Sequence, residues 1–217
     1  MFLLAVPAVA QQDPIVADRP GLADGPGVVG AGTMQLEFGV NRDDDGESLV
    51  TLPTLFRYGL SDALELRIES DVVEFSSGNR ERAPIALGVK WRIREGDVPI
   101  SLIASVQTED VEGSVRITSD IDLGSGFSLT PNAGVSIAEG EDAVGVIAAT
   151  VEHGFGNATP FVDFELQSGG GDTSMIFDAG VAWLVTNDTQ LDVSAGVEVA
   201  GTAYPDWFIG AGISRRF

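Results

Sequence analysis

The chain has 217 residues, enough for one domain, and 33 acidic against 12 basic side chains give it a formal charge of −21. So negative a surface repels nucleic acid, which excludes a nucleic-acid-binding role. The absence of cysteine excludes disulfides, thiolate metal sites and cysteine nucleophiles. The mean hydropathy is slightly positive at +0.17, yet no apolar run approaches the roughly 18 residues of a membrane-spanning helix. The hydrophobic residues must therefore be spread over short segments.

Residues 1–10, MFLLAVPAVA, are typical of the end of an export signal peptide. Phe2 to Val6 form a short apolar core, and Ala8-Val9-Ala10 is an A-x-A cleavage site. The basic start of such a signal is missing, so we expect the signal to begin upstream of Met1. The alternative is a buried N-terminal strand. Residues 11–32 then hold three prolines and five glycines without periodicity, which predicts an irregular segment in the periplasm or in a barrel lumen.

From Thr33 onward, segments of about ten residues alternate between apolar and polar positions. The first has Met34, Leu36 and Phe38 on one face, with Gln35 and Glu37 on the other. This pattern predicts an all-β fold, a transmembrane antiparallel up-and-down β-barrel of about twelve strands over residues 33–217. The expected strands are 33–41, 48–60, 64–74, 84–94, 98–108, 114–123, 127–137, 143–153, 159–167, 173–185, 190–199 and 207–217.

The connections between these segments alternate in length. One set is longer and often acidic, as in 42–47 and 139–142, whereas the other set is tight, as in 61–63 and 124–126. Long outer loops and short periplasmic turns are the arrangement of barrels in the outer membrane of Gram-negative bacteria. The alternative architecture is a soluble periplasmic ligand-binding β-barrel or sandwich, whose apolar face would turn inward.

Aromatic side chains on the apolar face fall close to the predicted ends of the strands. In a membrane barrel such residues form girdles at the lipid–water interfaces. The expected girdle consists of Tyr58, Trp91, Phe127, Trp183 and Phe217 on the periplasmic side and Trp207 on the outer side.

The opposite face carries the charges that we expect to line a pore. The basic ones are Arg57, Arg67, Lys90, Arg92, Arg94, Arg116 and Arg216. The acidic ones are Asp120, Asp122, Glu152, Asp163, Glu165, Asp178, Asp192 and Glu198. Walls of opposite sign could orient and select solutes. Alternatively, the charges pair into a network that fills the lumen, since Glu65, Glu69 and Asp71 lie near the basic group.

Several stretches resemble the family of outer-membrane barrels described as the putative MetA-pathway of phenol degradation. They are Asp18-Arg-Pro-Gly21, Met34-Gln-Leu-Glu37, Thr51 to Leu60 with Leu64-Glu-Leu-Arg67, Leu87-Gly-Val-Lys-Trp91, Asp178-Ala-Gly180 with Leu191 to Gly196, and Gly210 to Phe217. The resemblance implies a barrel that passes small, aromatic or otherwise hydrophobic compounds across the outer membrane. The terminal Phe217 also looks like the signal read by the barrel-assembly machinery, although Arg215 stands where an apolar residue is usual.

We therefore expect a channel or transporter for small solutes, whose identity the sequence leaves open. The alternatives are a closed barrel with a structural or surface-interaction role and the soluble periplasmic barrel. The expected partners are outer-membrane lipids, lipopolysaccharide and the barrel-assembly machinery. No enzyme, cofactor or metal site is predicted. His153, the only histidine, is expected to face lipid, and Asn41-x-Asp43-x-Asp45-Gly46 lacks the glutamate that would complete a calcium loop.

Overall fold

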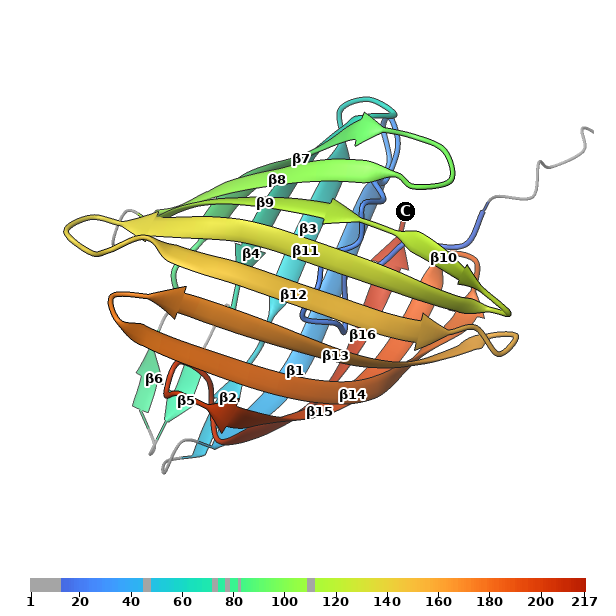
Figure 1. The fold of residues 1–217 in the computed structure, drawn as a ribbon. Helices are drawn as coiled ribbons and strands as arrows, with labels where there is room; N and C mark the ends of the chain where they lie inside the picture. Colours follow the sequence, from blue (N-terminus) through green and yellow to red (C-terminus); the bar gives the residue numbers. More distant parts are fainter. Residues whose placement is uncertain (1–12, 45–47, 72–73, 77–78, 82, 109–111) are drawn as a thin grey trace, which may run out of the picture.

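The computed structural model is a single closed sheet of antiparallel strands, curled into a barrel (Figure 1). It describes residues 13–217 apart from 45–47, 72–73, 77–78, 82 and 109–111. The sheet closes where the last strand, β16 (Trp207–Arg216), pairs with the first, β1 (Met34–Asp44). Gln35 is opposite Arg216 and Asp44 is opposite Trp207 in this seam. Among the residues that the model describes, no helix is long and apolar enough to cross a membrane.

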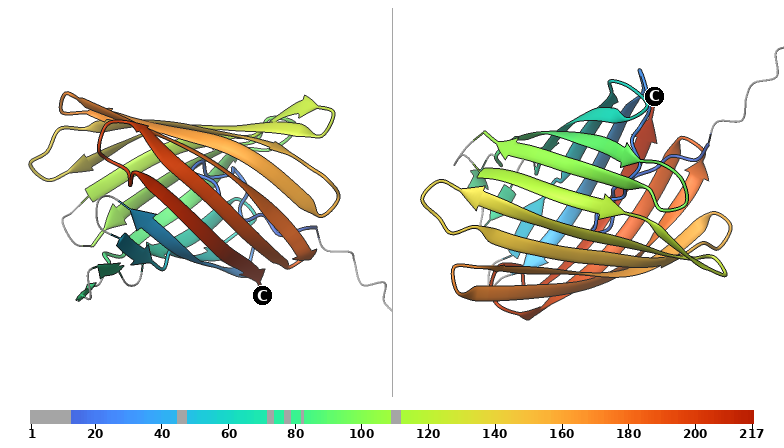
Figure 2. Two further views of the ribbon diagram at one scale, coloured as in Figure 1. Left: turned by 90° about the horizontal axis from the view of Figure 1, so that it is seen from below. Right: turned by 45° about the horizontal axis from the view of Figure 1, so that its top comes forward.

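The strands follow one another around the wall in chain order (Figures 1 and 2). Between β1 and β16 they are β2 (Ser48–Thr51), β3 (Thr54–Gly59), β4 (Leu64–Ser70), β5 (Glu74–Ser76), β6 (Asn79–Glu81), β7 (Ala86–Arg94), β8 (Ile100–Gln107), β9 (Glu112–Ser119), β10 (Ile121–Gly124), β11 (Phe127–Ala138), β12 (Val144–His153), β13 (Ala158–Gly169), β14 (Asp172–Thr186) and β15 (Thr189–Ala200). Four wall strands consist of two pieces each, namely β2 with β3, β4 with β5, β6 with β7, and β9 with β10. The wall therefore has twelve strands, which confirms the predicted fold.

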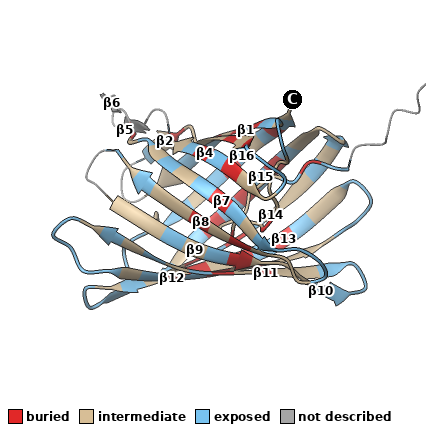
Figure 3. Ribbon diagram, turned by 90° about the horizontal axis from the view of Figure 1, so that it is seen from above, coloured by how far each residue is buried: buried red, intermediate tan, exposed pale blue. Residues whose placement is uncertain are grey.

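The faces of the barrel are inverted relative to a soluble protein. In β1, Gln35 and Glu37 are buried on the inner face, whereas Met34, Leu36 and Val40 are exposed on the outer face. The same alternation continues around the wall (Figure 3). An apolar exterior over a polar interior is stable only where lipid covers the exterior. This pattern contradicts the alternative of a soluble barrel with an apolar core.

Some strands extend beyond their predicted ends on the side of the long loops. β1 runs to Asp44 instead of residue 41, and the expected loop at 75–83 contains the hairpin of β5 and β6. The sequence there is polar and was therefore predicted to be a loop. A hairpin that extends beyond the membrane can be polar on both faces, so its strands show no alternating pattern. The expected strand 48–60 is interrupted at Pro53, since proline has no amide hydrogen for the ladder.

Candidate functional site

The lumen contains the irregular N-terminal part of the chain. Residues 13–32, which we call the lumen segment, form no strand, and most of the segment runs inside the barrel (Figure 1). Its backbone contacts inward side chains of the wall. A buried segment without regular structure must find partners for its backbone elsewhere. The wall supplies them, because the amides of Leu22 and Val29 donate to the carboxylates of Asp163 (2.7 Å) and Glu65 (2.9 Å). The carbonyl of Pro26 accepts a hydrogen bond from Ser101 Oγ at 2.6 Å.

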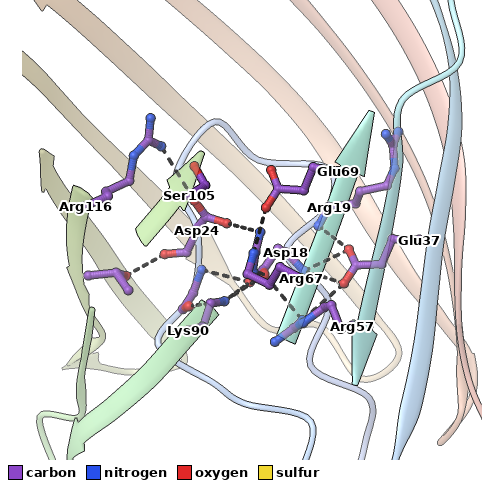
Figure 4. A network of polar contacts seen from close by, with 12 residues as sticks. Asp18, Arg19, Asp24, Glu37, Arg57, Arg67, Glu69, Lys90, Ser105 and Arg116 are labelled. Atoms are coloured by element: carbon purple, nitrogen blue, oxygen red, sulfur yellow. Dashed lines mark hydrogen bonds and ion pairs between the residues drawn. The ribbon is translucent and has the colours of Figure 1, made fainter. Parts of the chain in front are cut away.

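Asp18 is the electrostatic centre of the lumen segment (Figure 4). Its carboxylate lies 2.7 Å from Lys90 Nζ and 3.4 Å from Arg57 Nη1, and it also pairs with Arg67. Burial alone would raise the pKa of Asp18, but the three cations outweigh it and hold that pKa far below its usual value. Asp18 is therefore ionised, and it partly neutralises three cations on β3, β4 and β7.

The wall carries counter-charges of its own next to these cations. Arg57 is 0 % exposed and its Nε lies 2.8 Å from Glu65, while Nη1 lies 3.1 Å from Glu37. Arg67 pairs with Glu69 on its own strand at 2.7 Å. Glu37 in turn accepts hydrogen bonds from the backbone amides of Asp18 (3.0 Å) and Arg19 (2.9 Å). Segment and wall thus form one continuous network of paired charges.

The other predicted basic residues lie in separate places. Arg116 contacts the segment at the carbonyl of Leu22 (3.2 Å) and pairs with Glu165 at 3.2 Å. Arg92 pairs with Glu95 at 2.8 Å, and Arg216 pairs with Asp188 at 2.7 Å, both near short turns.

The prediction that Arg94 lines the lumen is wrong. Arg92 pairs with Ser101, and both point into the lumen. A bulge after Arg92 then pairs Arg94 with Ile100, the neighbour of Ser101, so Arg94 lies on the opposite face from Arg92. Arg94 is exposed and does not share the lumen-facing positions assigned to it from simple alternation. One extra residue in one strand suffices to reverse a face, and such a bulge is invisible to a pattern of period two.

The predicted acidic residues spread from the short turns to the long loops. Near the short turns, Asp122 accepts the Gly124 amide at 2.7 Å, Glu152 accepts Ser128 Oγ at 3.0 Å, and Asp120 lies 3.4 Å from Thr130 Oγ1. Near the long loops, Glu198 accepts the Tyr204 amide at 3.1 Å. Between these ends lie Asp163, Glu165, Asp178 and Asp192. The oxygens of Asp178 have no hydrogen-bond partner, although the side chain is buried.

Inward side chains border several cavities, and the two that the lumen segment also borders lie toward opposite ends of the barrel. The outer cavity, of about 320 Å³, is bordered by inward residues near the long loops, including Leu55, Glu69 and Gln107. The inner cavity, of about 450 Å³, lies toward the short turns and is bordered by much of the lumen segment and by wall residues that include Glu152 and Phe161. Two volumes with polar and charged walls can hold small solutes.

The expected girdle residues are on the lipid-facing side of the wall. Trp91, Trp183, Phe127 and Phe217 are exposed, and Trp207 lies on the opposite rim with Arg42 5.9 Å above its ring. Tyr58 is intermediate in exposure and pairs in register with Met34 on the outer face. His153 packs between Phe127 and Phe155, at ring distances of 4.2 and 4.3 Å. Its Nε2 forms a hydrogen bond with the backbone carbonyl of Ser125, and its described contacts include no acidic or nucleophilic side chain.

Sequence reasoning placed residues 11–32 in the periplasm or as a plug in the lumen, but it assigned no individual role to the segment's charged residues or to their partners on β1. Asp18, Arg19 and Asp24 belong to a segment without periodicity, and Glu37 and Gln35 were taken only as one polar face of a strand. The signal that could have identified them is the Asp18-Arg19-Pro20-Gly21 stretch, in which charges stand within a segment otherwise rich in glycine and proline.

Comparisons with known proteins agree with this architecture. Solved structures with similar folds include the KdgM porin (TM-score 0.64, 9 % identity, 83 % of this chain and 99 % of that chain) and the COG4313 outer membrane channel from Pseudomonas putida F1 (TM-score 0.65, 12 % identity, 91 % and 99 %). The NanC porin is similar to the same degree (TM-score 0.64, 8 % identity, 84 % and 98 %). These identities are low, so the likeness concerns the fold. No curated protein matches the sequence.

A family model matches nearly all of the described chain. It covers residues 17–217 and therefore includes most of the lumen segment together with the complete wall. The segment and the barrel are thus one unit of sequence as well as of structure. The chain belongs to the family described as putative MetA-pathway of phenol degradation.

Proposed function

We propose that the protein is an outer-membrane channel through which small solutes cross by way of the lumen, and that the lumen segment restricts this passage. The observation that carries the proposal is the pair of cavities toward opposite ends of a closed, polar-walled barrel. Barrels with fully packed interiors leave no such volumes. The channel fold shared with the porins supports the same function.

The solutes that we propose are small aromatic or otherwise hydrophobic compounds. The family description refers to phenol degradation. The inner cavity suits a small amphipathic molecule, because Phe161, Ile15 and Pro26 border it beside Thr150 and Gln190. Apolar surface with a few polar groups is the usual composition of a small-molecule site.

A second candidate function, a closed barrel with a structural role, is favoured by one specific observation. The pairing of Arg67 with Glu69 at 2.7 Å and of Arg57 with Glu65 at 2.8 Å fills the centre of the lumen with matched charges. Such a network can stabilise a barrel that passes nothing.

Conductance in a planar bilayer tests the channel against the closed barrel. The refolded mature protein is inserted under a salt gradient, and its current is compared with that of Asp18→Asn, which weakens the hold of the segment on three cations. We expect discrete current steps that become longer or more frequent in the variant. Silence from both proteins, with folding and insertion demonstrated, would remove the channel and leave the structural role.

Liposome swelling tests the solute class. Phenylalanine and glutamine are similar in size and carry no net charge, and neither crosses a lipid bilayer rapidly by itself. We expect faster swelling with phenylalanine in liposomes that contain the protein. Equal rates for the two amino acids would contradict a preference for hydrophobic solutes while leaving the channel in place.

A further inference from the structure

Arg19 occupies a distinctive position between the two cavities. It borders the outer cavity and also the inner one, and no other residue of the described ranges borders both. Several residues of the lumen segment border the inner cavity, but only Arg19 borders the outer cavity as well. Arg19 is therefore the side chain that these two volumes share.

The wall forms a fitted seat for the Arg19 guanidinium. Gly39 of β1 and Gly212 of β16 are direct cross-strand partners in the seam of the barrel. A Cβ built on Gly39 would lie 2.4 Å from Nη1 of Arg19, and one on Gly212 would lie 2.4 Å from its Nε. Any side chain at either position would therefore displace the guanidinium. Asp192, the partner of Gly212 on β15, completes the seat and accepts a hydrogen bond from Nη2 at 3.0 Å.

The side chain of Arg19 is held more weakly than the segment that carries it. Its Nε and Asp192 Oδ2 have no hydrogen-bond partner, and the side chain is 14 % exposed. In contrast, the neighbouring Asp18 is paired with three buried cations, and the Arg19 amide donates to Glu37 at 2.9 Å. Asp192 is fully buried, so separating this one pair also has a cost, but moving Asp18 would break three such pairs. The side chain can thus leave its seat while the backbone stays in place.

We propose that Arg19 is the gate of this channel, and that rotation of its side chain out of the seat of Gly39, Gly212 and Asp192 joins the two cavities while the lumen segment remains anchored. The inference rests on the proposed channel function. It adds the residue that opens the path and the charge that the path then presents. With Arg19 displaced, Asp192 has no counter-charge among its described contacts, so the open gate favours cations.

Two variants open the gate by independent routes. Arg19→Ala removes the side chain, whereas Gly212→Ala keeps the arginine and fills its seat. In single-channel recordings of the full mature chain we expect both to show a persistent open level that the wild type lacks. Under a salt gradient the reversal potential of Arg19→Ala shifts toward that of a cation-selective pore, and adding Asp192→Asn reverses much of this shift.

Matched controls separate the gate from general loosening. Arg216→Ala removes another arginine that contacts the lumen segment, at the carbonyl of Asp13, and that borders none of these cavities. Gly145→Ala adds a methyl group in a strand where it meets only ordinary contacts. Both variants should show the same single-channel currents as the wild type. Hydrogen exchange of the amides of Leu22 and Val29, which donate to wall carboxylates, reports whether the segment stays anchored.

Each outcome bears on one proposal. Persistent currents with protected amides support the gate. Persistent currents with lost protection overturn it, because the whole segment has then left the lumen. If Asp18→Asn conducts and Arg19→Ala does not, the gate is wrong and the channel stands. Silence from every variant in folded, inserted protein removes the channel itself and the gate with it.

Discussion

Asp163 and Asp178 are direct cross-strand partners on β13 and β14, and both carboxyl groups are buried on the inner face. Asp163 has partners in the amide of Leu22 at 2.7 Å and Thr150 Oγ1 at 3.3 Å. Asp178 has none, and Gly196 stands opposite it on β15. Like charges directly opposed in a sheet destabilise it, so this pair is an unfavourable feature of the wall.

Asp178→Asn should therefore stabilise the barrel. Removing one of two opposed charges is expected to raise the free energy of unfolding by up to about 1 kcal/mol. The urea midpoint of unfolding from detergent micelles measures the change. Asp192→Asn is the matched control, because it removes a carboxylate that pairs with Arg19 and should not stabilise. A lower midpoint for Asp178→Asn would mean that this carboxylate has a favourable partner in the folded protein.

Asp18→Asn should be strongly destabilising. The carboxylate is shared by Arg57, Arg67 and Lys90, and its loss leaves these buried cations with fewer counter-charges. Breaking a buried ion pair from one side typically costs about 3–5 kcal/mol. Asp13→Asn, an exposed acid at the start of the described segment, serves as control and should unfold as the wild type. An unchanged midpoint for Asp18→Asn would show that Glu37 and Glu65 compensate the cations by themselves.

The contribution of Asp18 also predicts a dependence on acid. Its pKa in the folded protein lies far below the ordinary 3.8 of an unfolded chain, because three cations outweigh the effect of burial. Asp18 therefore contributes its full stabilisation of the fold at pH values above the ordinary pKa, and this contribution is lost as the pH falls below that pKa. Stability of the wild type should decline more steeply below the ordinary value than that of Asp18→Asn. Parallel declines of the two proteins would indicate that Asp18 is not paired in solution.

The wall of the barrel and its inward charges were predictable from the sequence, whereas the individual contacts of the lumen segment were not. Strands with one lipid-facing side repeat a period-two pattern, and this pattern located the wall at Met34 and again at Leu191 or Ile213 without any knowledge of pairing. Single insertions break such reasoning, as the bulge beside Arg94 shows. The lengths of β1 and of the β5–β6 hairpin were underestimated because polar strand ends have no apolar face to mark them.

The lumen segment has no periodicity because it follows no regular backbone. Its position is set by contacts such as Asp18 with Lys90, which lie 72 residues apart in the chain. No spacing in the sequence encodes a pair so distant. The sequence also does not reveal the glycine pair under Arg19, because Gly39 and Gly212 become neighbours only when the barrel closes. Their glycine identity matters for the packing of a side chain from a third segment, which composition alone cannot reveal.

The tryptophans provide a test of membrane depth that is independent of conduction. The chain has three, and Trp91, Trp183 and Trp207 are all exposed on the outer face near strand ends. Aromatic side chains at such positions lie at the level of the lipid headgroups. In liposomes with brominated lipids, bromines near the headgroups should therefore quench the fluorescence more than bromines near the bilayer centre. Variants that retain one tryptophan, with the other two replaced by phenylalanine, assign the depth of each. Stronger quenching from the bilayer centre would contradict the assigned girdle, and no quenching at all would mean that this face of the barrel does not meet lipid.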